Sequence, residues 1–161
     1  MASMKTDPAT TRPDLDGASG FACRLGMAWE PLGRVTAGDD GRLVFPKVAK
    51  APALYRLCIR QGGRDAVYIG ETENLSRRFG NYRNPGPTQQ TSKRINAKLR
   101  DAIQAGADIA VAVVLSGAWI DWGTGLQDAN LSSKVIRCLF ENAAISAGGA
   151  EDVEMLNRTT G

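Results

Sequence analysis

The apolar residues of this 161-residue chain alternate between strand-like runs and helix-like stripes over most of its length. Residues 54–60 and 66–69 are β-like runs, and the polar turn between them at 61–65 suits a hairpin. Residues 108–115 form a third apolar run, with a length and composition typical of a central strand. These three runs predict a small antiparallel or mixed β-sheet.

Three further stretches, near 74–83, 92–105 and 133–147, show helical spacing instead. Thr72 or Asn74 is a candidate N-cap for the first of them. The apolar positions are Leu75, Phe79 and Tyr82 in the first helix, Ile95, Leu99 and Ile103 in the second, and Ile136, Phe140, Ala143 and Ala147 in the third. The predicted fold class is therefore α/β, more narrowly α+β, with helices flanking a small central sheet.

The remaining segments define the expected organisation of the chain. Residues 1–20 are polar and aperiodic, which predicts a disordered tail. Residues 21–52 hold two short apolar segments around an Asp-Gly step, which predicts a β-extension with a hairpin. This extension should add strands to the main domain at 53–161. Residues 116–131, with two tryptophans among glycines, are predicted to be an inserted loop.

Composition narrows the chemistry. The chain has no histidine, which excludes histidine-based nucleases, serine and cysteine triads and most transition-metal sites. Its three cysteines are far apart in sequence, which favours free thiols in a reducing compartment and a cytoplasmic location over a zinc site. No run approaches the roughly 18 to 20 apolar residues that span a bilayer, so a membrane is not an expected partner.

Positive charge is concentrated in one part of the chain. The net charge is only +3, but residues 77–100 contain seven basic residues and no acidic one. They are Arg77, Arg78, Arg83, Lys93, Arg94, Lys98 and Arg100. A stretch of one sign is typical of a protein that binds a phosphate backbone, and the alternative is a solvated helical face. The nucleic-acid-binding residues predicted from this stretch are Arg77, Arg83, Lys93, Arg94 and Lys98.

Two of the strand-like runs carry a tyrosine in a short motif. The first reads Ala53-Leu54-Tyr55, the second Tyr68-Ile69-Gly70, and Arg78 follows ten residues after the second tyrosine. Together they resemble the GIY-YIG nuclease family, over about residues 53–158. The local string looks most like the GIY-YIG domain of the incision subunit in bacterial nucleotide excision repair. Only the first motif departs from the pattern, with Ala and Leu in place of Gly and Ile.

The resemblance implies a set of site residues and a metal. The catalytic residues would be Tyr55, Tyr68, Arg78, Tyr82, Glu141 and Asn157. Glu141 would hold Mg²⁺ or Mn²⁺, Arg78 would bind phosphate oxygens, Tyr55 would activate the nucleophile, and the other tyrosines would position water and phosphate. Since there is no histidine, a tyrosine must act as base. A phenol with a pKa of about 10 can do so only if Arg78 and the metal depress that pKa.

Each of these positions also has a structural interpretation. Taken alone, strand tyrosines more often pack in a core, Arg78 suits a solvated surface and Asn157 suits a turn. Glu141 has the spacing of a surface ion pair with Arg137. The joint pattern favours a metal-dependent endonuclease that hydrolyses phosphodiester bonds in single-stranded, branched or duplex DNA. The alternatives are a non-catalytic nucleic-acid-binding module and a dimeric restriction-type endonuclease. No sequence-reading module is visible, so specificity is expected from 21–52, 116–131, a partner protein or substrate shape.

Overall fold

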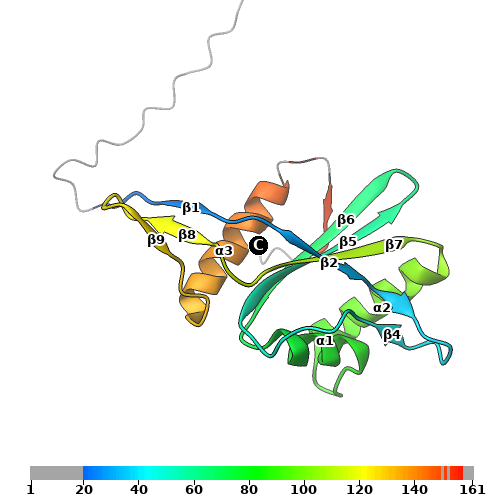
Figure 1. The fold of residues 1–161 in the computed structure, drawn as a ribbon. Coiled ribbons are helices and arrows are strands. Elements are labelled where there is room, and N and C mark those ends of the chain that lie inside the picture. Colours follow the sequence, from blue (N-terminus) through cyan, green and yellow to red (C-terminus); the bar gives the residue numbers. More distant parts are fainter. Residues whose placement is uncertain (1–19, 150, 152, 158–161) are drawn as a thin grey trace, which may run out of the picture.

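A five-stranded mixed sheet lies at the centre of the protein, with strand order β10-β6-β5-β7-β2 (Figure 1). The computed structural model describes residues 20–149, 151 and 153–157. The tail predicted over 1–20 lies, except for Gly20, outside these residues. The strands of this sheet are β2 (Glu30–Arg34), β5 (Ala53–Gln61), β6 (Arg64–Thr72), β7 (Asp108–Val114) and β10 (Glu154–Met155). All neighbours are antiparallel except β10 and β6. The predicted α+β fold is confirmed.

The predicted hairpin of two tyrosine-bearing strands is β5 and β6. Gly62 and Gly63 form its turn at φ of 59° and 76°, values that favour glycine. β5 lies between β6 and β7 and is buried on both faces, which explains its nearly continuous apolar sequence. In this register Tyr55 pairs with Gly70 and Leu57 with Tyr68.

The three predicted helices are present as α1 (Leu75–Arg83), α2 (Gln90–Gln104) and α3 (Lys134–Gly149). The Asn74 side chain caps α1, because its Oδ1 accepts a hydrogen bond of 3.0 Å from the N–H of Arg77. Alternate β5 residues separate two cores. Tyr55 and Leu57 pack with residues of α1 and α2, whereas Leu54 packs with Phe140 of α3. The helices therefore cover opposite faces of the sheet (Figure 1).

The residues before β5 contribute to three sheets. β2 pairs with the outer edge of β7, and the short strands β3 (Thr36–Ala37) and β4 (Leu43–Val44) form the hairpin expected around the Asp-Gly step. Leu43 and Phe45 are buried in the same core as α1 and α2. β1 (Arg24–Gly26) instead joins β8 (Trp119–Asp121) and β9 (Leu126–Asp128) in a second small sheet.

The prediction of a loop at 116–131 is wrong, because β8 and β9 form a hairpin there. The Asp121 carboxylate holds its turn by accepting hydrogen bonds from the N–H groups of Gly123 and Gly125, at 2.7 and 3.2 Å. Strands of three residues leave too few alternating positions for a pattern to be detected in the sequence. Within the described part of the chain, no helix is long and apolar enough to cross a membrane.

Candidate catalytic site

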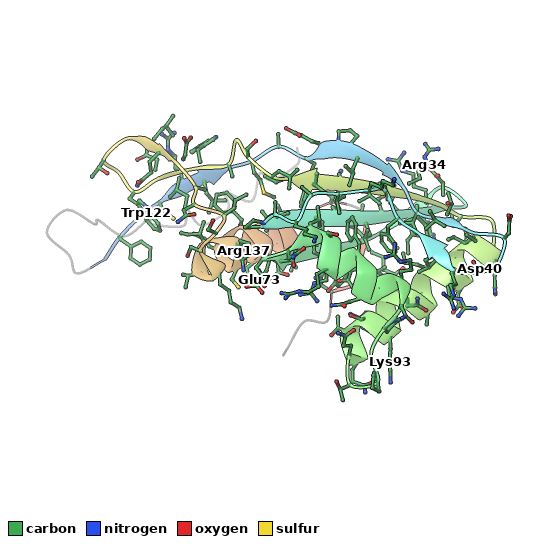
Figure 2. The ribbon with its side chains drawn as sticks, turned by 60° about the horizontal axis from the view of Figure 1, so that its bottom comes forward. Arg34, Asp40, Glu73, Lys93, Trp122 and Arg137 are labelled. Carbon is green, nitrogen blue, oxygen red and sulfur yellow. The ribbon has the colours of Figure 1, made fainter. Side chains whose placement is uncertain are left out.

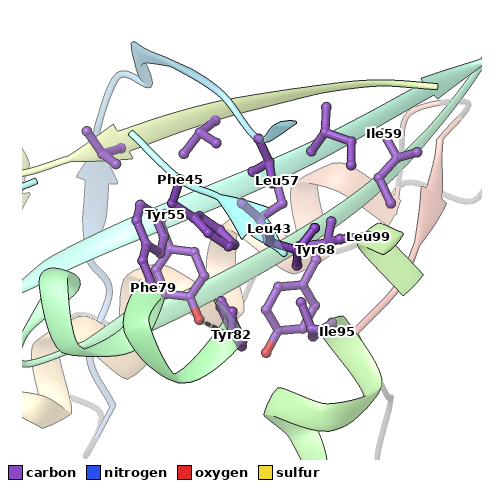
Figure 3. Close-up of a cluster of buried hydrophobic side chains, with 14 of the residues drawn as sticks. Leu43, Phe45, Tyr55, Leu57, Ile59, Tyr68, Phe79, Tyr82, Ile95 and Leu99 are labelled. Atoms are coloured by element: carbon purple, nitrogen blue, oxygen red, sulfur yellow. Dashed lines mark hydrogen bonds between the residues drawn. The ribbon is translucent and has the colours of Figure 1, made fainter. Parts of the chain in front are cut away.

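The three tyrosines predicted for the site lie together on the face of the sheet that α1 and α2 cover (Figure 3). They come from three elements, Tyr55 from β5, Tyr68 from β6 and Tyr82 from α1. The hydroxyl groups of Tyr55 and Tyr82 are hydrogen-bonded at 2.5 Å. The ring centroids of the three residues are 6.0 to 6.4 Å apart. All three side chains are buried, so the predicted tyrosines do converge, within the core.

Gly70, the last residue of the Tyr-Ile-Gly triplet, makes room for this cluster. It lies directly opposite Tyr55 in the β5–β6 register. A Cβ atom at position 70 would be 2.2 Å from the Tyr55 hydroxyl oxygen, closer than any non-bonded contact allows. The glycine is therefore required by the tyrosine that packs across it.

The ionisation of the tyrosines differs from the expectation. Burial raises the pKa of Tyr55 well above its usual value, the charges of Tyr82 and Tyr68 raise it further, and Arg78 lowers it by less. Burial also raises the pKa of Tyr82, again with a contribution from Tyr68. Arg78 thus lowers the pKa of Tyr55 as predicted, but by less than burial raises it, and the contribution predicted from the metal stays a prediction. Without a metal, Tyr55 and Tyr82 have raised pKa values, so both are neutral phenols at neutral pH.

Arg78 is half-buried on α1, close to both the tyrosine cluster and Glu71. It precedes Tyr82 by one helical turn, so the two side chains leave the same face of the helix. Burial alone would lower the pKa of Arg78, but the nearby Tyr55, Tyr82, Tyr68 and Glu71 together raise it. The charge of one guanidinium thus acts on the tyrosine cluster and on Glu71 at the end of β6.

Glu141 is half-buried on α3 and lies near the same end of β6. Burial raises its pKa, and the charge of Glu71 raises it further, while the backbone N–H of Glu71 and the charge of Arg78 lower it. The alternative of a surface pair between Glu141 and Arg137 is wrong. Arg137 pairs instead with Glu71, at 2.7 Å from Nε to Oε2. The structure therefore brings Glu141 within range of Arg78.

The raised pKa of Glu141 predicts that this carboxylate destabilises the fold. A carboxyl group whose pKa is higher in the folded state than in the unfolded state lowers stability as the pH rises through that folded pKa. Glu141→Gln should therefore unfold at a higher temperature than the wild type at pH 7 in EDTA. The difference should vanish as the pH falls below the ordinary glutamate range, about 4.3.

Thermal unfolding followed by circular dichroism at several pH values measures this effect. Glu73→Gln is the matched control, because Arg77 lowers the pKa of that exposed carboxyl group. The control should give no stabilisation at pH 7. A Glu141→Gln variant less stable than the wild type at pH 7 would contradict the prediction.

A cleft of about 480 Å³ opens beside Arg78. Its basic side chains outnumber its acidic ones, and Figure 2 shows two of the lining residues, Glu73 and Arg137, near each other. The lining residues are Glu71, Thr72, Glu73, Arg77, Arg78, Asn81, Gln89, Lys134 and Arg137. Of the predicted catalytic residues only Arg78 lines the cleft, while Glu141 lies next to its wall at Glu71.

Sequence reasoning missed two of these residues, Glu71 and Arg137. A signal for Glu71 was present, since it is the residue directly after the Tyr-Ile-Gly triplet. Arg137 gave none, because its partner lies 66 residues away in the chain.

Asn157 lies beside β6, where its side chain binds the strand backbone and not the other predicted site residues. Its side chain accepts a hydrogen bond from the N–H of Ile69 at 3.0 Å and donates one to the Ile69 carbonyl at 2.7 Å. These bonds continue the edge pairing of β6 past the end of β10. Asn157 thus fixes the backbone just before Gly70, and both polar ends of its amide are occupied.

The predicted DNA-binding residues differ in how far contacts within the protein occupy their side chains. Arg77 is paired with Glu73, and Arg94 donates to the Leu156 carbonyl at 3.0 Å with its guanidinium 5.9 Å from the Tyr68 ring centroid. Lys93 donates to the Pro87 carbonyl at 2.6 Å but is exposed. Arg83 and Lys98 are exposed and have no ion-pair partner among the described residues.

The acidic residues fit a hard cation better than a soft one. In residues 20–149, 151 and 153–157, no group of three or more Asp, Glu, Cys or His side chains could hold a metal ion. Mg²⁺ needs fewer protein ligands, because it retains several waters and is usually bound by one or two carboxylates. Glu141, whose ionised form is disfavoured by burial and by Glu71, is a suitable ligand for such an ion.

Comparison with known proteins bears on the fold. No protein-family model and no curated protein matches the sequence. Among solved structures, a mutant of bacteriophage T4 EndoII matches with a TM-score of 0.50 and 18% sequence identity, over 71% of this chain and 86% of that one. The chain has the fold of EndoII. This match is not to the excision-repair incision subunit, and that closer resemblance stays a prediction.

Proposed function

We propose that this protein is a metal-dependent endonuclease that hydrolyses DNA phosphodiester bonds in the cleft beside Arg78. The observation that carries the proposal is the position of Arg78, which lines a cleft together with Glu71 and lies on α1 one helical turn before Tyr82 of the buried tyrosine cluster. The shared fold with EndoII and the resemblance of the tyrosine motifs to GIY-YIG nucleases support the same conclusion.

The proposed roles follow from what each side chain can do. Arg78 presents a permanently charged planar fork that matches two phosphate oxygens and stabilises the charge that develops on them. Glu141 would hold Mg²⁺ or Mn²⁺. When bound, the ion supplies Lewis acidity and lowers the pKa of a coordinated water.

Without a bound cation, the tyrosines cannot act as a base. Tyr55 and Tyr82 are buried, neutral and hydrogen-bonded to each other. A neutral phenol cannot remove a proton from water at neutral pH. We therefore assign these two residues to the positioning of Arg78, and Tyr55 would act as a base only if the bound cation lowered its pKa.

The substrate would be bound mainly through its backbone. Arg83, Lys93 and Lys98 are exposed and lie on α1 and α2, the helices that cover the tyrosine face. Phosphate contacts position a duplex or a single strand without reading its bases. Weak sequence selectivity is therefore expected, with shape or a partner protein supplying specificity. The three cysteines are free thiols, which suits the reducing environment of the cytoplasm.

The exposed basic residues should give DNA binding a measurable salt dependence. Replacing Arg83 or Lys98 by alanine should reduce the slope of log affinity against log salt concentration by about 0.7 to 0.9, because each phosphate contact releases condensed counterions. Fluorescence anisotropy of a labelled oligonucleotide over a range of salt concentrations measures the slope. The control Arg60→Ala should leave the slope unchanged, because Arg60 is paired with Asp65. An unchanged slope in the Arg83/Lys98 double variant would show that these residues do not contact DNA.

The proposed activity is tested with supercoiled plasmid and with labelled single-stranded, duplex and branched oligonucleotides. The wild type should cleave at least one substrate with Mg²⁺ or Mn²⁺ and none with excess EDTA. Binding without cleavage of any substrate would contradict the proposal and favour a non-catalytic nucleic-acid-binding module.

A further inference from the structure

Glu71 occupies a special place at the end of β6. Side chains alternate along a strand, and Val67 and Ile69 belong to the core that contains Ala144 and Ile145 of α3. Glu71 therefore points to the α3 face, opposite to the tyrosine cluster. Because it is near the end of the strand, its side chain is part of the lining of the cleft.

A buried arginine holds the Glu71 carboxylate in place. The Nε atom of Arg137 donates to Glu71 Oε2 at 2.7 Å. The Nη1 atom of the same guanidinium donates to the carbonyl groups of Leu131 and Ser132, at 2.9 and 3.0 Å. The side chain of Arg137 is only 4% exposed and that of Glu71 is 16% exposed. Removing two charges from water is costly, so this pair is poor evidence for stability and better evidence for a positional role.

Glu141 shares this location. It follows Arg137 by four residues on α3, so both side chains leave the same face of the helix, toward the end of β6. Since Arg137 is hydrogen-bonded to Glu71, Glu141, one helical turn further along α3, lies beside the same end of β6. Two glutamates from different elements thus converge in a partly buried place.

A purely structural role for Glu71 would be to neutralise Arg137. The contacts do not have the form expected of that role, since a neutralising carboxylate commonly binds arginine with both oxygens. Here Oε2 alone is bonded to Arg137, and Oε1 has no hydrogen-bond partner within the described part of the chain. One oxygen is anchored and the other is available at a residue that lines the cleft.

We propose that Glu71 and Glu141 together bind the divalent cation, and that Arg137 is a positioning residue that fixes Glu71. The proposal rests on the proposed function and adds a second carboxylate to its metal site. Two carboxylates completed by several waters are the usual protein contribution to a Mg²⁺ or Mn²⁺ site. A cation between them would also offset the repulsion of two negative charges in a partly buried place.

Binding of Mn²⁺ alone, without DNA, tests the proposal. Calorimetric titration or the electron paramagnetic resonance signal of free Mn²⁺ would compare the wild type with Glu71→Gln, Glu141→Gln and the control Glu73→Gln. Glu71→Gln and Glu141→Gln should each lower the affinity by at least about tenfold. Glu73→Gln should leave it unchanged, because that carboxylate lines the cleft but is paired with exposed Arg77.

The outcomes separate this proposal from the proposed function. Wild-type Mn²⁺ affinity in Glu71→Gln, with a loss in Glu141→Gln, would overturn the role of Glu71 and leave the proposed nuclease intact. Absence of Mn²⁺ binding by the wild type would overturn both.

A second variant separates loss of the metal ligand from loss of folded protein. Glu71→Gln leaves Arg137 buried without its partner, which destabilises the protein. The double variant Glu71→Gln/Arg137→Gln removes both charges, and thermal unfolding would show that it is folded. It should still bind Mn²⁺ at least about tenfold more weakly than the wild type. Wild-type affinity in the folded double variant would mean that Glu71 only neutralises Arg137, and would overturn the proposal.

Discussion

Replacing Arg78 by alanine should slow DNA cleavage by about a thousandfold, the lower end of what an arginine contributes to phosphoryl transfer. Arg78 is the one predicted catalytic residue that lines the cleft, and its charge acts on Glu71, Glu141 and the tyrosines. Without it, negative charge developing on the phosphate oxygens has no fixed partner. Arg78→Lys should recover little of the rate, because an ammonium group cannot reproduce the planar fork.

The neighbouring residue provides a matched control. Arg77 lines the same cleft but is exposed and paired with Glu73. Arg77→Ala should leave single-turnover cleavage within a few-fold of the wild type, about 1 kcal/mol in the barrier at most. Thermal unfolding of each variant would separate a catalytic loss from a loss of folded protein. A folded Arg78→Ala variant with wild-type cleavage would contradict the assignment.

Replacing Gly70 by alanine should lower the free energy of unfolding by about 2 to 3 kcal/mol, the upper part of the usual cost of overpacking. The new methyl group would meet the Tyr55 hydroxyl oxygen at 2.2 Å, inside a core that cannot expand freely. Tyr55 would have to move, and its hydrogen bond to Tyr82 would be lost or distorted. The variant should therefore also lose cleavage activity.

Urea denaturation measures this cost, and Gly80→Ala is the appropriate comparison. Gly80 lies within α1, and the nearest atom to an added Cβ there is Arg83 Nη2 at 3.8 Å. Since glycine is unfavourable inside a helix, Gly80→Ala should stabilise the protein by about 0.5 to 1 kcal/mol. A Gly70→Ala variant as stable as the wild type would show that Tyr55 is not packed across position 70.

The sequence predicts those parts of the fold that have strong local patterns. β5 is a long apolar run because both of its faces are buried, and α1 has apolar residues on one face and a capping asparagine. The β8–β9 hairpin could not be predicted, because strands of three residues in a glycine-rich segment have no detectable alternation. Its turn is held by the local hydrogen bonds of Asp121, and its strand β8 pairs with β1, which is remote in sequence.

The candidate site could be predicted only in part, for the same physical reason. Spacing identified the tyrosines and Arg78, but it contains no measure of burial, and burial is what raises the pKa of Tyr55. The four-residue spacing of Arg137 and Glu141 suggested an ion pair between them. The pair actually forms between Arg137 and Glu71, which the packing of α3 on β6 brings together.

The most direct test of the central claim is the cleavage rate of Glu141→Gln relative to the wild type, with both proteins purified in parallel. Each would be assayed under single-turnover conditions on its DNA substrate with Mg²⁺ and with EDTA. We predict cleavage by the wild type in Mg²⁺ only, and a rate at least a hundredfold lower for Glu141→Gln, which corresponds to about 2.7 kcal/mol of transition-state stabilisation. The variant should bind DNA at least as tightly as the wild type, since a negative charge has been removed near the phosphate site. Equal cleavage by the two proteins would contradict the assignment of Glu141 as the metal-binding residue of a nuclease.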